Sequence, residues 1–346
     1  MKSTDKLFLI SCICLCFFSF KVHVHAQTPL TIKDQKQLAS PKDATKNKNI
    51  WSPQLKLSSQ LQFGSSQSVI GQVDGDTTTI GFNLDSGLNY LEGANDWRQT
   101  LTYAGATSRT PSLPRYTKSA DELNYRSLYI YKFKETKSIS PYFDVSLKAP
   151  VFKGEDIRAE TITYQNLSTG DILVSDTFRL TDGFKPLTTR QSVGAISEII
   201  KKKNQSMLVR LGFGAIQVQA DDQLVIDDNA DTANVIEVRP LKSYSESGIE
   251  AGLEYKGKWD KRSSYAFKLD ILYPISPEKE AGDERSDVDL TNVDAQLTLS
   301  SKIYDWASVE FISKALRQPL LLNDWQIQNN LQLKFTYDIF SGEKKK

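Results

Sequence analysis

The last long segment of the chain, residues 325–339, alternates in polarity at every second residue. One parity is polar throughout, and the other holds Trp325, Ile327, Asn329, Leu331, Leu333, Phe335, Tyr337 and Ile339. Because successive side chains of a strand point to opposite faces, the pattern predicts a strand with one apolar and one wet face. At ~3.4 Å per residue it would run roughly 50 Å, which suits a strand that crosses a bilayer at a tilt and projects beyond it.

The same alternation recurs along the chain, whereas helical periodicity is missing. The predicted strands are 55–63, 80–90, 97–103, 123–133, 143–151, 188–199, 207–215, 249–259, 265–273, 293–303, 309–311 and 325–339. Beyond the first 26 residues the sequence contains no apolar run of the ~18 residues that a membrane-crossing helix needs. The sequence therefore predicts an all-β protein, a single antiparallel transmembrane β-barrel of about 12 strands.

The links between these strands alternate in length. The short links are 91–96, 134–138, 201–206, 260–264 and 304–306, and the longer ones are 64–79, 106–122, 152–187, 220–246, 274–290 and, of moderate length, 316–324. Outer-membrane barrels have short periplasmic turns, long extracellular loops, an even strand number and both termini in the periplasm. The short links are therefore expected to be periplasmic turns and the longer ones extracellular loops.

The N-terminus reads as a secretion signal. Lys2 and Lys6 precede an apolar stretch, 7–20, and a short polar region ends at Ala26, where cleavage is expected. A rival interpretation takes Leu9–Cys12 as a lipobox with Cys12 lipidated; it leaves a very short apolar region, so ordinary secretion is favoured. The expected organisation is a signal peptide at 1–26, a flexible polar periplasmic segment at 27–50, the barrel at 51–340 and a charged tail at 341–346.

Cleavage near Ala26 removes every histidine and cysteine. The chain has three cysteines and two histidines, all of them before Gln27. Disulfides, His/Cys zinc sites, thiolate nucleophiles and His-based triads are thereby excluded from the mature chain, so we expect neither an enzyme nor a bound cofactor. The net charge of +1 becomes about −1 without the signal peptide, and no basic face is evident, so nucleic acid is not an expected partner.

The wet faces of the strands carry charges of both signs. The lumen candidates are Arg98, Arg126, Lys148, Arg210, Glu250, Glu254, Lys268, Asp270 and Lys334. Such residues can line a water-filled pore or pair across a narrow lumen, and 12 strands lie between the filled barrels of ~8 strands and the open ones of ~16–18. The favoured function is a small outer-membrane channel for polar solutes. The alternative is a sealed structural or interaction barrel whose long outer loops bind ligands, divalent ions or partner proteins.

Two predicted outer loops are acidic. Asp227, Asn229 and Asp231 match the opening of a calcium loop, but Thr232 replaces the glycine at the sixth position and Val238 the glutamate at the twelfth. A solvated acidic loop is therefore favoured over a metal site. The loop around 278–289 is also acidic and is expected at the surface, where it would hold divalent ions beside lipopolysaccharide.

Tryptophans mark the ends of the predicted strands. Trp51, Trp97, Trp259 and Trp306 fall at periplasmic ends, and Trp325 falls at the outer end. Aromatic girdles at the two bilayer interfaces explain this placement.

Four short motifs resemble a known group. They are FRLTDGFKPLTTRQSVG at 178–194, ESGIEAGLEY at 246–255, FKLDIL at 267–272 and WQIQN at 325–329. Through them the chain resembles the outer-membrane barrels of Bacteroidota that are classified only as a domain of unknown function. The resemblance implies a barrel in the Gram-negative outer membrane, with no established activity. For the predicted barrel, the expected partners are outer-membrane lipid, lipopolysaccharide and the barrel-assembly machinery.

Overall fold

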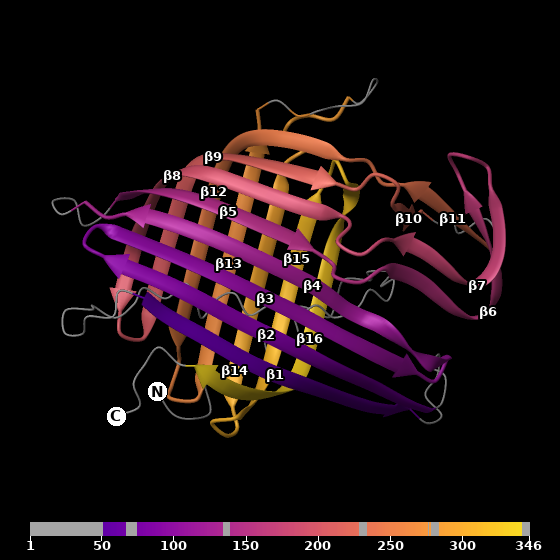
Figure 1. Ribbon diagram of the computed structural model, residues 1–346, viewed down its shortest axis with the longest axis horizontal. Coiled ribbons are helices and arrows are strands. Elements are labelled where there is room, and N and C mark those ends of the chain that lie inside the picture. Colours follow the sequence, from indigo (N-terminus) through magenta and orange to yellow (C-terminus); the bar gives the residue numbers. More distant parts are fainter. Residues whose placement is uncertain are drawn as a thin grey trace, which may run out of the picture.

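The computed structural model describes residues 51–66, 75–133, 139–227, 234–275, 277 and 284–340. Twelve antiparallel strands form a closed barrel (Figure 1). They are β1 (Trp51–Ser66), β2 (Gly75–Glu92), β3 (Asn95–Thr110), β4 (Leu113–Tyr131), β5 (Ser140–Ala149), β8 (Leu187–Lys202), β9 (Gln205–Gln219), β12 (Tyr244–Lys258), β13 (Ser263–Pro274), β14 (Asn292–Lys302), β15 (Ala307–Gln318) and β16 (Leu322–Phe340). The predicted fold class is confirmed, and each predicted strand overlaps one strand of the barrel.

The first and last barrel strands close the ring. β1 pairs antiparallel with β16 from Leu55 opposite Phe340 to Leu61 opposite Leu333, with one bulge after Leu55. Closure leaves no unpaired sheet edge, which is the condition for backbone to lie in a hydrocarbon medium. Within the described ranges no helix is long and apolar enough to cross a membrane.

The barrel is inverted in polarity relative to a soluble protein. On β16, Leu331 is 64% exposed while its neighbour Gln332 is 6% exposed, and on β9, Leu211 is 59% exposed beside Arg210 at 3%. Other apolar residues exposed on the outer face are Ile80, Phe82, Leu88, Leu101, Phe143, Leu147, Val193, Phe213, Ile249, Val309 and Ile327. A continuous apolar outer surface is unstable in water and suits contact with lipid.

Aromatic side chains gather at the short-turn end of the barrel. The Trp51 ring lies 4.8 Å from Tyr90 and 6.3 Å from Trp97, between ring centroids. Trp306 stacks on Phe335 at 5.8 Å, and Trp259 lies 5.1 Å from Tyr265. This band has the position expected of one interfacial girdle, and Trp325 lies near the other end, at the start of β16.

Two of the predicted long or moderate links are tight turns. β3 and β4 extend into the predicted loop 106–122 and leave only a two-residue turn, Pro111-Ser112. β15 and β16 are joined by residues 319–321. The prediction of a loop at 106–122 was wrong because both faces of these strand ends are largely wet. Thr107, Arg109, Arg115 and Tyr116 are all exposed, so the alternation in polarity ends before the strands do.

The prediction that 152–187 and 220–246 are loops was also wrong. Together these two segments form a second sheet. It contains β6 (Gly154–Asn166), β7 (Ile172–Thr181), β10 (Leu224–Ile226) and β11 (Val235–Pro240), in the order β10-β11-β6-β7. β11 pairs parallel with β6, from Val235 opposite Thr163. Such pairing between two separate connections leaves no local signal in the sequence.

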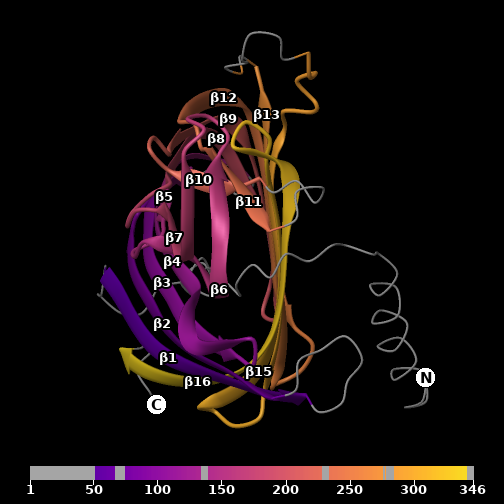
Figure 2. The same ribbon diagram turned by 90° about the vertical axis from the view of Figure 1, so that its right-hand side faces the viewer.

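The second sheet has its own core and an anchor on the barrel. Tyr164, Ile236 and Val238 are buried together, and burial followed by the charge of Asp156 raises the pKa of Tyr164 to about 12. Arg115 at the tip of β4 donates to the Asp176 carboxylate at 2.9 Å. The sheet lies beyond the barrel end opposite the short turns (Figure 1), and in the turned view it lies in front of the barrel strands (Figure 2).

We expect the substitution Leu211→Lys to destabilise the barrel by about 2–4 kcal/mol in lipid vesicles, because it places a charge near the middle of the lipid-facing strand β9. Urea unfolding of the refolded protein measures this. Asn204→Lys, in the exposed turn before the same strand, is the matched control and should stay within about 0.5 kcal/mol of wild type. Equal, small effects of both substitutions would mean that the outer face lies in water.

Candidate functional site

The barrel interior is polar and crossed by ion pairs. Arg126 on β4 contacts Glu254 on β12, and Lys314 on β15 contacts Glu122 on β4, although neither pair of strands is adjacent in the ring. Contacts between non-adjacent strands form through the interior. These side chains therefore face the lumen.

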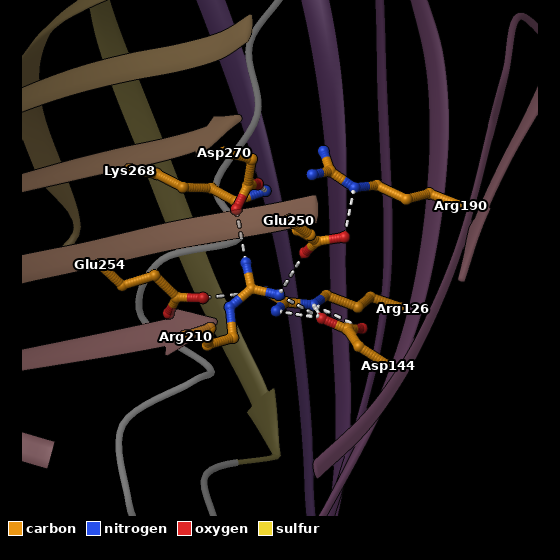
Figure 3. A network of polar contacts seen from close by, with 8 residues as sticks. All are labelled: Arg126, Asp144, Arg190, Arg210, Glu250, Glu254, Lys268 and Asp270. Carbon is orange, nitrogen blue, oxygen red and sulfur yellow. Dashed lines mark hydrogen bonds and ion pairs between the residues drawn. The ribbon is translucent and has the colours of Figure 1, made fainter. Parts of the chain in front are cut away.

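Arg210 is the centre of the largest network (Figure 3). Its Nη1 lies 2.8 Å from Asp144 Oδ2 and 3.3 Å from Glu250 Oε1, and its Nη2 lies 2.5 Å from Asp270 Oδ1. The Arg210 side chain is 3% exposed and those of the three carboxylates 1–8%. A guanidinium suits this position because its planar donors reach several carboxylates at once and it stays charged when buried.

The network continues on both sides of Arg210. Arg126 donates from Nε to Asp144 at 2.9 Å and from Nη1 to Glu254 at 3.0 Å. Arg190 reaches Glu250 at 3.2 Å, and Lys268 reaches Asp270 at 2.9 Å. Four cations thus face four anions, so the buried charges cancel. That balance limits the cost of holding them away from water.

Glycines on β9 and β12 make room for the network. A Cβ on Gly252 would lie 2.8 Å from Arg210 Nη2, and one on Gly214 would lie 2.5 Å from Glu250 Oε2. Both glycines point inward, on the same wall as the charges they accommodate. The Gly-rich inward faces of 210–214 and 248–252 are therefore part of the site.

A second ion cluster bridges the lumen nearer the long connections. Glu122 accepts from Lys148 at 3.2 Å and from Lys314 at 3.3 Å. Asp294 on β14 lies close enough to attract both lysines. Lys148 and Lys314 reach Glu122 from nearly opposite sides of the ring.

These groups line a cavity of about 290 Å³ in the half of the lumen next to the long connections. The Arg210 network forms its floor. On β4 the lining ends at Arg126 and on β5 at Asp144, and the next inward side chains belong to a buried apolar cluster. That cluster consists of Leu128, Ile130, Tyr142 and Ile196, with Leu208 packed against it. The cavity is therefore blocked toward the short turns along this wall.

The wall formed by β3, β2, β1 and β16 is polar but mostly uncharged. Along β2, Thr79, Asn83, Asp85 and Asn89 are all buried and point inward, and Ser58, Gln60, Thr100, Thr102 and Gln332 join them from neighbouring strands. Lys334 is fully buried there, 3.9 Å from Glu310. Small polar side chains thus run along β2 as far as Asn89, which aligns through Arg98 on β3 with Leu128 of the apolar cluster.

The structure places all nine predicted lumen residues on inward-facing positions. Arg126, Arg210, Glu250, Glu254, Lys268 and Asp270 lie in one network. Lys148 pairs with Glu122, and Arg98 pairs with Asp96 at 2.6 Å near the short turns. Lys334 lies on β16, in the mostly uncharged wall.

Glu122, Arg190 and Lys314 also face the lumen but were not among the predicted lumen residues. Glu122 fell in the link 106–122 that was taken as a loop, and Lys314 fell just beyond the short segment 309–311. Arg190 lies on the weakly patterned strand 188–199. Each of these three residues has the same parity as the inward-facing residues of its strand, so extending the period-2 pattern along the strand would have identified it.

The calcium-loop candidate is only partly described. Asp227 Oδ2 forms an ion pair with Arg239 Nε at 2.9 Å, which ties it to the second sheet. Asn229 and Asp231 lie outside the described residues, as do 278–283 of the second acidic loop. Among the residues that the structure covers, no group of His, Cys, Asp and Glu could hold a metal ion.

No protein-family model matches the chain, and no curated protein matches its sequence. Among solved structures, it is similar to an outer membrane channel from Pseudomonas putida F1, at 12% identity over 87% of this chain and 100% of that one, with a TM-score of 0.39. It is also similar to the translocator domain of the autotransporter NalP from Neisseria meningitidis, at 10% identity over 85% and 90%, with a TM-score of 0.35. A Pseudomonas aeruginosa FadL homologue matches at 8% identity over 84% and 91%, with a TM-score of 0.31. Scores this low carry no inference about function, and the barrel is established by its own strand pairing.

Replacing Arg210 with methionine leaves Asp144, Glu250 and Asp270 without their shared cation. We expect Arg210→Met to destabilise the barrel by about 3–5 kcal/mol in urea unfolding, because it leaves uncompensated buried charge. Adding Asp270→Asn to that variant should recover part of the loss. Lys202→Met, at the exposed end of β8, is the control, and a network variant as mild as this control would show that the ion pairs contribute nothing to stability.

Proposed function

We propose that the protein is an outer-membrane channel for small polar solutes whose lumen is closed in the conformation described. The observation that carries the proposal is the cavity that ends on the Arg210 network. It adjoins the long connections, is lined by charged and polar groups and continues beside a polar wall along β2.

The outer face supports the membrane location. An apolar belt around a closed barrel requires lipid, and the aromatic band at the short-turn end suits a bilayer interface. A secretion signal at 1–26 would deliver the chain to the Gram-negative outer membrane. Assembly there would depend on the barrel-assembly machinery, and the outer end of the barrel would meet lipopolysaccharide.

The interior supports solute passage more than a purely structural role. A barrel that serves only as an anchor can fill its lumen with apolar side chains, whereas here buried amides and hydroxyls line one wall throughout. The apolar cluster occupies only the wall of β4, β5, β8 and β9. Movement of that cluster and of the network above it would join the cavity to the short-turn side.

The charge balance bears on selectivity. The cavity is lined by seven cationic and six anionic side chains. A lining with almost no net charge does not favour ions of one sign, unlike a ring of like charges. The channel should therefore pass neutral or zwitterionic solutes in preference to simple ions.

A sealed interaction barrel is the second candidate. Its supporting observation is the end of the β6–β7 hairpin, where Ile172, Leu173 and Val174 are 66%, 51% and 62% exposed. Consecutive exposed apolar residues at a hairpin tip suit a protein contact. This candidate requires that the lumen never opens.

Bilayer recordings separate the two candidates. We expect wild-type protein to show brief, infrequent openings, and the double variant Leu128→Ala, Ile196→Ala to show longer ones, because it removes bulk from the apolar cluster. Val193→Ala with Leu211→Ala is the control; it changes the same class of side chain on the lipid face and should leave the openings unchanged. Silence from wild type and both variants, with folded barrels, would favour the sealed barrel.

Location and orientation have a separate test. An epitope tag inserted after Thr169, in the β6–β7 turn, should be labelled on intact cells, because that turn is exposed on the side of the long connections. A tag after Lys203, in the β8–β9 turn, should be labelled only after the outer membrane is opened. The reverse pattern would invert the orientation, and recovery of the protein in the soluble periplasm would contradict the membrane location.

A further inference from the structure

The cavity contains donors and acceptors that the protein itself does not satisfy. Arg190 donates to Glu250 through Nε, but its Nη2 is buried and has no hydrogen-bond partner among the described residues. In Figure 3 the terminal nitrogens of Arg190 point away from Glu250, and no dashed line joins them to any of the residues drawn. A buried guanidinium nitrogen without a partner is costly and marks a place where a ligand oxygen gains a strong contact.

Acceptors line the same cavity. Asn292 is 5% exposed; its Nδ2 donates to Glu246, whereas its Oδ1 has no partner within the described part of the chain. Gln328 Oε1 is buried and equally unpartnered. Asp294 adds a carboxylate to this side of the lining. These oxygens suit a positively charged donor.

From these atoms we infer that the cavity is a binding site for small zwitterionic solutes of amino-acid size. The solute carboxylate would accept from Arg190 Nη2, and its ammonium would donate to Asn292 Oδ1, Gln328 Oε1 and Asp294. The inference rests on the proposed function and names the solute class for that same lumen.

Size and charge narrow the ligand further. A cavity of about 290 Å³ lies at the lower limit of ordinary ligand pockets, so the solute is small. The lining has nearly equal numbers of cationic and anionic side chains, so a ligand without net charge keeps that near balance. A sugar matches the size but offers no carboxylate to the arginine, and a zwitterion brings both charges with no net charge.

The test is calorimetric titration of the refolded full chain in detergent micelles. L-glutamine should bind, whereas acetate, ethylammonium and glucose should each bind at least about tenfold more weakly, since each lacks one or both charges. Arg190→Gln and Asn292→Leu should each weaken L-glutamine binding by about tenfold or more. Lys256→Gln is the matched control: Lys256 lies on the inward face of β12 but does not line the cavity, so its loss should leave binding unchanged. Heat-modifiable gel mobility confirms that every variant is folded.

Several results would overturn the inference. They are glucose binding as tightly as L-glutamine, wild-type affinity in folded Arg190→Gln, and no binding of L-glutamine to the folded wild-type protein. Conductance without zwitterion binding would remove the inference and leave the channel. Binding without conductance would keep the site and remove the channel.

Discussion

The structure depends on the pairing of β1 with β16. In hydrocarbon every backbone N–H and C=O group needs a partner within the protein, and a sheet satisfies that condition only when it closes on itself. Closure then sets the polarity of every side chain, because alternate residues must face either lipid or lumen. The exposed leucines and phenylalanines outside and the buried arginines and carboxylates inside are both consequences of that one ring.

Closure of about 12 strands also explains why the lumen is crowded with ion pairs. The enclosed space is wider than side chains of an 8-stranded barrel fill and narrower than a porin channel. Long charged side chains such as Lys314 and Glu122 can therefore meet across it. Arg210 gathers three carboxylates because glycines at 214 and 252 leave the space that this arrangement occupies. Because these cations and carboxylates pair with one another, the inner wall remains polar while the lumen is closed.

Much of the barrel could be predicted from the sequence, because strand polarity is a local property. Period-2 alternation located strands overlapping all twelve in the ring, and their inward faces held all nine chosen lumen residues. The prediction failed where the structure does not follow from the local sequence pattern. The ends of β3 and β4 carry polar side chains on both faces, so their sequence shows no alternation to mark them as strand. The second sheet depends on the parallel contact between β6 and β11, which are separated along the chain by β7, β8, β9 and β10. The partners of Arg210 come from β5, β12 and β13, and no spacing in the sequence encodes that convergence.

The central claim is that one face of each barrel strand contacts lipid and the other a closed polar lumen. Spin labels attached at single cysteines replacing residues 331, 332, 333 and 334 of β16 test it directly, in protein reconstituted in vesicles with Cys12, Cys14 and Cys16 replaced by serine. Collision with oxygen reports contact with lipid, and collision with a water-soluble nickel chelate reports contact with water. The account predicts high oxygen and low nickel accessibility at 331 and 333, with low accessibility to both reagents at 332 and 334. High nickel accessibility at 331 and 333 would contradict the membrane barrel, and high nickel accessibility at 332 and 334 would contradict the closed lumen.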